Sequence, residues 1–553
     1  MNESTENNQT KNNKNDESSS KTCLYASSET IQNLHEDIEC LWTPTKIPVL
    51  KKPPSKFIFL RDYVSKNIPC IIQNAITTKN YNSFVPNDYS DEEDGDDLKE
   101  GDRKPTILTL DDIVDVLTCS ATTCGEEKLP IMTVDVTPDG RGDCIRTVIA
   151  PNEDEKDTQK EDKADQEQQR NYFKTKRMFV KPCEEKMDII TFRDKLRLGR
   201  QKWKEQRQKQ KQTTKKTQLP KNEEGLSIYP LLINHNGKSK EMKNKQNQCH
   251  DEKHNGNNGT TKENSPEQSK KGQGCDDEHP YPVLYYSRQN DCLRTELKHL
   301  FDLNLFPSTF DFAQECFGYG SPPDAINLWI GDERAVSSMH KDHYENLFYV
   351  LSGEKVFTLC PPADAPFLYE GEFDSGAFSR CHRYDECEDN EVENKEEGWG
   401  IAPDVDDDDE EEDNTKVESG KSEATKIDRS FVKARWILPD VDNILISSHH
   451  DCKQDAVRCD DIMKVNYYRK NYPLLRHTHP IRISVKEGEM LYLPSLWFHR
   501  VTQTKETVGI NYWYDMRFDS SHWCYFNFMQ QLQSCPVGGE SISGGHDDDG
   551  IVH

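Results

Sequence analysis

The chain has 553 residues, a formal net charge of −28, 33% hydrophobic residues and 31% charged residues. This length allows roughly two to four domains, but the low apolar fraction indicates a compact folded part interrupted by long polar segments. The negative charge disfavours direct nucleic-acid binding, which needs a basic surface, and suits a basic protein partner. The sequence has no apolar run of transmembrane length and no apolar segment near residue 1 that would indicate secretion, so we expect no membrane association.

The 18 cysteines have no tight repeating spacing, which indicates free thiols rather than a disulfide framework. We therefore expect a cytoplasmic protein. The Lys- and Gln-rich segment 201–221 is a weak candidate for a nuclear signal, because basic runs in polar inserts are more often simply solvated.

Polar and acidic segments divide the chain into parts that are expected to fold and parts that are not. The expected parts are a disordered N-terminus (1–40), the N-terminal part of the folded unit with acidic inserts (41–200), a disordered polar insert (201–279), the first half of the core (280–380), an acidic disordered insert (381–462), the second half of the core with a C-terminal helix (463–533) and a tail (534–553).

Short apolar runs at close spacing, with few helical patterns, predict a mainly β fold. Strands are expected at 281–289 and 324–331, and 339–362 is expected to form a hairpin with its turn at Ser352–Gly353. A second hairpin-rich set follows at 481–516. Together these strands predict a double-sheet jelly roll of the cupin type with flanking helices and long disordered inserts. The aromatic segment 523–532 is expected to pair with its copy in a homodimer or to pack on its own barrel.

The sequence His340-Lys341-Asp342 stands at the head of an apolar alternating run. On a strand, residues i and i+2 point to the same side, so His340 and Asp342 would face one way. Two histidines and one carboxylate on one face of an iron leave positions open for a cosubstrate and O2, and His499 is the best candidate for the third ligand. The competing interpretation is a chance HxD pattern on a surface strand and an ordinary packed histidine.

Other groups of histidine and cysteine are weaker candidates for a metal site. Their sequence context places none of them on a strand within a hairpin set, and the cysteine-containing group lacks the second pair that zinc sites usually have. These groups are His477 with His479, His449 with His450 and Asp451, His546 with Asp547, and Cys381 with His382 and Cys387.

Lys355 lies just past the Ser352–Gly353 turn in an apolar stretch. Burying a lysine there is costly unless it meets an anion, and a dicarboxylate that binds the metal at one end would supply one. An equally good interpretation is that Lys355 lies on an edge strand and discourages aggregation there. Asn511 is a parallel case, because Gly509, Asn511 and Trp513 would face the barrel interior if Val508, Ile510, Tyr512 and Tyr514 pack outward.

Several blocks together resemble the JmjC-domain hydroxylases that depend on Fe(II) and 2-oxoglutarate. The blocks are KPPSKFIFLRDYV, PCIIQNA, VDVTPDG, DAINLWIG, HKDHYENLFYVLSGEKVFTLCPPAD, EGEMLYLPSLWFHRV and NYWYDM. The resemblance implies a double-stranded β-helix with Fe(II), 2-oxoglutarate and O2, and the residues that it implies are His340, Asp342 and His499 for iron, Lys355 for the distal carboxylate of 2-oxoglutarate, and Asn346, Asn511, Tyr285 and Ser337 for the rest of the cosubstrate pocket. A shift of one register step would put Tyr286 there instead of Tyr285.

Within that family, the resemblance is to enzymes that carry out (3S)-lysyl hydroxylation of developmentally regulated GTP-binding proteins, with decarboxylation of 2-oxoglutarate to succinate and CO2. It therefore implies a protein substrate with a target lysine. The alternatives are an oxygenase or demethylase acting on another residue type, an endopeptidase acting on histone tails, and a non-catalytic binding protein of the cupin fold. A cationic side chain entering a dry site needs an acidic partner, but the sequence does not indicate which carboxylates supply it.

Overall fold

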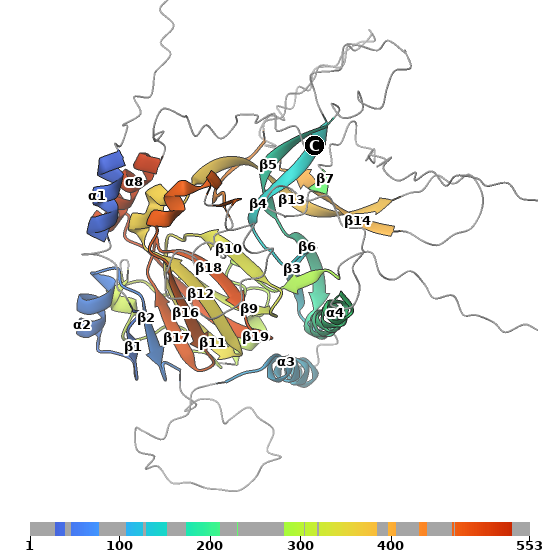
Figure 1. The fold of residues 1–553 in the computed structure, drawn as a ribbon. Helices are drawn as coiled ribbons and strands as arrows, with labels where there is room; N and C mark the ends of the chain where they lie inside the picture. Colours follow the sequence, from blue (N-terminus) through green and yellow to red (C-terminus); the bar gives the residue numbers. More distant parts are fainter. Residues whose placement is uncertain are drawn as a thin grey trace, which may run out of the picture.

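A computed structural model gives the fold of the chain (Figure 1). It describes residues 28–38, 46–76, 107–124, 129–151, 173–210, 229–230, 281–303, 305–317, 320–383, 396–404, 431–439, 467–468 and 470–533. The acidic insert at 88–97, the tail 534–553 and most of the inserts 201–279 and 381–462 lie outside these residues.

Two facing sheets form a barrel at the centre of the molecule (Figure 1). Successive strands alternate between the sheets in each half of the barrel, which is the arrangement of a double-stranded β-helix and confirms the predicted jelly roll. The larger sheet has the order β1 (Val49–Leu50), β2 (Cys70–Gln73), β17 (Glu489–Leu493), β11 (Tyr344–Ser352), β19 (Thr507–Asp515) and β9 (Ala325–Gly331). The smaller sheet has the order β10 (Val336–His340), β18 (Phe498–Gln503), β12 (Glu354–Cys360) and β16 (Ile481–Lys486).

The predicted hairpin at 339–362 is wrong, although its turn is where the sequence placed it. Gly353 has a φ of +91°, which favours glycine over residues with a side chain. The strands on either side of the turn belong to different sheets, because β11 pairs with β17 and β19 whereas β12 pairs with β16 and β18. Strands that are buried on both faces carry no sequence signal that separates a hairpin from a change of sheet.

Alternation along the strands of the larger sheet builds two separate cores. On β11, Leu347 and Tyr349 belong to an outer core, whereas Phe348 and Val350 face the barrel interior. The same alternation holds on β19, where Val508, Ile510, Tyr512 and Tyr514 pack outward and Trp513 packs inward, as predicted. The helices that contribute buried side chains to the outer core are α2 (Lys56–Phe59), α3 (Leu110–Cys124), α4 (Ile189–Gln210) and α5 (Lys298–Asp302).

Two further sheets lie beside the barrel. A small sheet consists of β6 (Cys183–Asp188), β3 (Ile131–Thr137) and β8 (Val283–Tyr285). The other, which we call the outer sheet, consists of β14 (Glu396–Pro403), β13 (Glu370–Arg383), β5 (Phe173–Lys181), β4 (Cys144–Pro151) and β7 (Tyr229–Pro230), with β15 (Lys433–Ile437) paired to β13. Figure 1 shows it above and to the right of the barrel.

Three segments that were expected to be disordered contain regular structure. Helix α1 (Ser28–Asp37) lies within the predicted N-terminal region, α4 extends into the predicted polar insert, and β14 and β15 lie within the predicted acidic insert. The polar composition of these regions predicts a solvated chain, but β14 and β15 gain stability by pairing with β13, and α1 and α4 gain it by packing apolar side chains on the core clusters.

Helix α8 (Ser521–Gln533) lies beside α1 (Figure 1). Helix α8 packs Phe526 and Met529 in a core cluster with Phe498, while Phe528 is exposed, so a homodimer through this segment stays a prediction. Within the described residues, no helix is long and apolar enough to cross a membrane. The other short helical segments are η2 (Leu60–Val64), η6 (Gln314–Cys316), η7 (Pro362–Phe367) and η8 (Pro473–His477).

Candidate metal centre

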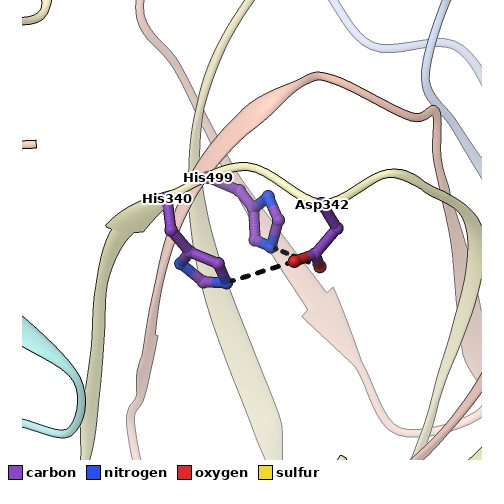
Figure 2. Close-up of side chains that lie close together, drawn as sticks. All are labelled: His340, Asp342 and His499. Carbon is purple, nitrogen blue, oxygen red and sulfur yellow. Dashed lines mark ion pairs between the residues drawn. The ribbon is translucent and has the colours of Figure 1, made fainter. Parts of the chain in front are cut away.

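The smaller sheet and the loop that follows β10 bring His340, Asp342 and His499 together (Figure 2). His340 ends β10 and pairs in register with His499 on β18, and Asp342 lies just beyond the strand rather than on it. Nε2 of His340 is 4.0 Å from Oδ1 of Asp342, and Nε2 of His499 is 3.5 Å from Oδ2. One ligand atom from each residue lies within 4.8 Å of the others, which is the spacing that a single metal ion needs.

Backbone hydrogen bonds fix the orientation of both imidazole rings. Nδ1 of His340 donates to the carbonyl oxygen of Ser338 at 2.7 Å, and Nδ1 of His499 donates to that of Trp497 at 2.9 Å. Because a carbonyl can only accept, each Nδ1 carries the proton and each Nε2 keeps a free lone pair. This is the arrangement in which a histidine binds a metal through Nε2.

The protonation states also suit a cation. Burial, together with the neighbouring His499, lowers the pKa of His340 to about 4. Burial alone would raise the pKa of Asp342, but its contact with His499 and the positive charges of the histidines outweigh that effect and lower this pKa to about 2. At neutral pH, His340 is therefore a neutral imidazole and Asp342 a carboxylate, which are the forms that bind metals.

Among the described residues, these three side chains form the one group with the spacing of a metal site. His479 is engaged elsewhere, because its Nδ1 lies 2.7 Å from Oδ1 of Asp364, and Arg476 donates to His477. The remaining histidine and cysteine candidates lie outside the residues whose side chains the structure describes: His449, His450, Asp451, His546, Asp547, Cys381, His382 and Cys387.

Lys355 lines the same pocket as the triad and is 1% exposed. Its ammonium group donates to the hydroxyl of Tyr285 at 2.9 Å and lies over the rings of Tyr285, Trp329 and Phe348 at 5.4, 5.3 and 4.7 Å. The rings stabilise the cation, but burial still lowers the pKa of Lys355 to about 7. The side chain is thus a buried cation without a carboxylate partner among the described residues, which is the condition that favours an anionic ligand.

Tyr285, rather than Tyr286, faces this pocket. Tyr285 lines it beside Ser337, whose contact lowers the pKa of the tyrosine while burial raises it more strongly. Tyr286 points to the other side of the strand, where its hydroxyl donates to Glu296 at 3.1 Å within the outer core. The geometry thus fixes the register step that the sequence left open.

Asn346 and Asn511 complete the interior end of the pocket with a residue that sequence reasoning missed. Asn511 donates to Oδ1 of Asn346 at 3.4 Å, and its own Oδ1 accepts from the indole of Trp329 at 2.9 Å. All three residues line the pocket. Trp329 belongs to the predicted strand at 324–331, but only its pairing with β19 shows that it faces Asn511.

Three further pocket residues were also missed, and they come from outside the barrel. Asp135 lies on β3, Asp143 directly precedes β4, and Trp436 lies on β15. The ring of Trp436 stacks on His340 with the centroids 5.5 Å apart and the planes 5° from parallel, and its indole N–H donates to Ser338 at 3.0 Å. Asp135 carried one sequence signal, a charge inside an apolar strand pattern, whereas Asp143 and Trp436 carried none.

Comparisons with known proteins agree with this geometry. The family model described as a cupin-like domain matches residues 54–520. The chain is 34% identical over 256 residues to JmjC domain-containing protein E of Dictyostelium discoideum, covering 45% of this chain and 58% of the relative. It is 34% identical over 258 residues to lysine-specific demethylase JMJ32 of Arabidopsis thaliana, covering 45% and 57%. It is 32% identical over 255 residues to the human bifunctional peptidase and (3S)-lysyl hydroxylase JMJD7, covering 46% and 60%. The matched part thus spans under two thirds of each relative.

Proposed function

This chain belongs to the cupin-like domain family, and we propose that it is an Fe(II)- and 2-oxoglutarate-dependent oxygenase that hydroxylates a lysine side chain of a protein. The observation that carries the proposal is the position of two free histidine Nε2 atoms and one carboxylate in the same pocket as a buried lysine. A non-catalytic binding protein of the cupin fold would need neither the three metal ligands nor the buried lysine.

His340, Asp342 and His499 would hold the iron, since two imidazoles and a carboxylate are a ligand set that Fe(II) oxygenases use. The bound iron, with 2-oxoglutarate, would supply the activation of O2 that the protein's own side chains lack. Ser338 and Trp497 hold the imidazoles in place through their backbone carbonyls, so the ligands are positioned before the metal arrives.

Lys355 would bind the distal carboxylate of 2-oxoglutarate. The hydroxyl of Tyr285 accepts the lysine hydrogen bond and keeps the ammonium group pointed into the pocket. Asn346 and Asn511 would add polar contacts to the cosubstrate, and Trp329 holds the amide of Asn511 in one orientation. Ser337 lines the same part of the pocket and would donate a further hydrogen bond.

The proposed substrate is a lysine of a developmentally regulated GTP-binding protein, and the proposed location is the cytoplasm. The likeness to the human relative, whose name includes (3S)-lysyl hydroxylase, supports lysine as the target. A second candidate reaction is removal of a methyl group from lysine, which the name of the Arabidopsis relative favours. Both reactions use the same metal and cosubstrate, so the product distinguishes them.

The test is mass spectrometry of lysine-containing fragments of such a GTPase after incubation with the protein, Fe(II), 2-oxoglutarate and O2. One added oxygen on a lysine, absent with His340→Ala and strongly reduced with Lys355→Ala, is the expected result. Lys486→Ala, at an exposed position of β16, is the matched control and should keep full activity. Loss of a methyl group from a methylated fragment would favour the demethylase, and peptide cleavage without added oxygen would contradict the oxygenase proposal.

A further inference from the structure

The pocket of the triad contains two carboxylates to which the proposed reaction gives no role, Asp135 and Asp143. They come from different sheets, since Asp135 lies on β3 and Asp143 directly precedes β4 of the outer sheet. A carboxylate in a pocket wall loses solvation and needs hydrogen-bond donors or a cation in return. The partners of the two side chains therefore distinguish a structural role from a ligand-binding one.

The protein itself supplies few partners for them. Asp135 accepts a hydrogen bond from the hydroxyl of Ser287, and the backbone carbonyl of Asp143, not its carboxylate, accepts from Ser338. Within the described ranges, neither carboxylate forms an ion pair with a lysine or arginine. Asp135 and Asp143 are thus acidic groups of the pocket wall that no lysine or arginine of the described residues neutralises by direct contact.

The basic residues that influence these carboxylates are committed to other acids. The charge of Lys181 lowers the pKa of Asp143, but its ammonium group lies 2.8 Å from a carboxylate oxygen of Asp404. Arg288 acts on Asp135 in the same way and contacts Glu184.

The titration behaviour of the two carboxylates agrees with this arrangement. Burial, together with the charge of Asp135, raises the pKa of Asp143 to about 7. Burial likewise raises the pKa of Asp135 to about 6, although Ser287 opposes the shift. Two carboxylates that repel each other in a pocket wall are stabilised when a cation binds between them or beside them.

The opposite polarity is found at the interior end of the same pocket. Lys355 places a positive charge there, and Trp513, which is 5% exposed, has an indole N–H with no hydrogen-bond partner among the described residues. A buried N–H without a partner points to an acceptor that a ligand brings. The pocket therefore contains a positive group that suits an anion and two acidic groups that suit a cation, and the triad lines the same cavity.

A metal ion does not fit the two acidic groups. The two aspartates belong to no group of three ligands with metal spacing among the described residues. An organic cation fits better, because the wall beside the carboxylates also contains the flat ring of Trp436 stacked on His340. An apolar ring next to a charged group suits a side chain with an aliphatic stem and a cationic end.

We propose that Asp135 and Asp143 form the binding site for the cationic end of the substrate side chain, with its aliphatic stem lying along Trp436. This inference rests on the proposed oxygenase function for the reaction that follows binding. It assigns the selection of substrate to the outer sheet and β3, and the chemistry to the barrel. Both aspartates are substrate-positioning residues in this assignment.

The test compares the affinities of two compounds, each measured by equilibrium dialysis. They are Nα-acetyl-lysine-N-methylamide and its norleucine analogue, which has the same stem without the ammonium group. The full-length protein is expected to bind the lysine compound about tenfold or more tightly, the effect of a charge-assisted hydrogen bond. Asp143→Asn and Asp135→Asn should each remove most of that preference without weakening the binding of the norleucine compound. Asp115→Asn, at an exposed position of α3, is the control and should keep the preference.

Equal binding of the two compounds, or a preference that survives in both aspartate variants, would overturn the proposal. Tighter binding of the corresponding arginine compound supports the cation site and contradicts lysine as the target. Succinate formation from 2-oxoglutarate is measured separately. If the preference depends on the aspartates but no succinate forms, the cation site stands and the oxygenase function fails. If succinate forms without the preference, the oxygenase function stands and the cation site fails.

Discussion

The barrel and the outer sheet meet at one pocket but contribute different kinds of residue to it. The barrel supplies His340 and His499, which are opposite each other in a strand register, and Lys355, which is almost completely buried. The outer sheet supplies Trp436 on β15, and Asp143 directly precedes its strand β4. The metal ligands and Lys355 are thus held by the barrel strands and the loop after β10, whereas the side chains proposed to contact the substrate come from segments added around the barrel.

The largest effect is expected from removing a ligand in the barrel. In His499→Ala, one imidazole is lost and the remaining two ligands bind metal weakly. Wild-type protein should gain about 2.7 kcal/mol of stability when Mn(II), used as a redox-stable substitute for Fe(II), is present at 100 times its dissociation constant. The variant should gain almost none at the same concentration. Thermal unfolding with and without Mn(II) measures both.

The control for this prediction is His299→Ala, at an exposed position of α5. It should retain the full stabilisation by metal. A His499→Ala protein that folds and is still stabilised like the wild type would remove His499 from the metal site, and with it the proposal that the barrel alone holds the metal.

A second large effect is expected from Lys355→Met, and it has two opposite parts. The 2-oxoglutarate dissociation constant should rise by about 100-fold, because a buried charge partner of the anion is lost. The unfolding free energy of the ligand-free protein should instead rise by roughly 1–4 kcal/mol, since methionine fills the same space without a buried charge. Calorimetry measures the first change and urea unfolding the second.

Lys486→Met on β16 should change neither quantity. A Lys355→Met protein that is less stable than the wild type would mean that the ammonium group holds the barrel together. The anion would then be a secondary partner.

The shifted pKa of Lys355 also predicts how cosubstrate affinity depends on pH. Burial lowers this pKa from the usual 10.5 to about 7, so the charged form that binds an anion becomes scarce as pH rises above 7. The affinity for 2-oxoglutarate should fall between pH 7 and 9, by at most about tenfold per pH unit. Over the same interval the ligand-free fold should become more stable, because the unfolded chain keeps a proton that the folded state has lost.

Calorimetric titration at several pH values checks the affinity, and urea unfolding at the same values checks the stability. In Lys355→Met the residual affinity should not change over this interval. If the wild-type affinity is also constant from pH 7 to 9, Lys355 is not the group that binds the distal carboxylate.

The sequence predicts the barrel better than the outer sheet, for a physical reason. Alternation of apolar residues is a local signal, and it placed the strands of β9, β11 and β19 and the inward direction of Asn511 correctly. Which strands pair is a non-local property, so the sequence pattern at Gly353 predicts a hairpin where the chain in fact changes sheet.

The site follows the same division. His340 and Asp342 were predicted because they are two residues apart in the sequence, and His499 because it follows an apolar strand and a proline. Trp436 could not be predicted, because β15 is a short strand in a charged segment and gains its position only by pairing with β13. Charge composition predicts solvation well, but it does not reveal a single aromatic side chain that a sheet carries to the pocket.

The smallest effect on metal binding is expected from Trp436→Ala, which changes the outer sheet and not the barrel. The indole stacks on His340, yet the carbonyl of Ser338 holds that imidazole without it. Mn(II) affinity should therefore fall only a few-fold, whereas binding of the lysine compound should fall further because its stem loses the apolar wall. Trp399→Ala, on β14 of the same sheet and packed against Phe378, is the matched control. It should leave both affinities unchanged, and urea unfolding measures any loss of stability in the two variants. If Trp436→Ala instead abolishes metal binding as completely as His499→Ala, the outer sheet is part of the metal centre. The proposed division, in which the barrel holds the metal and the outer sheet contacts the substrate, then does not hold.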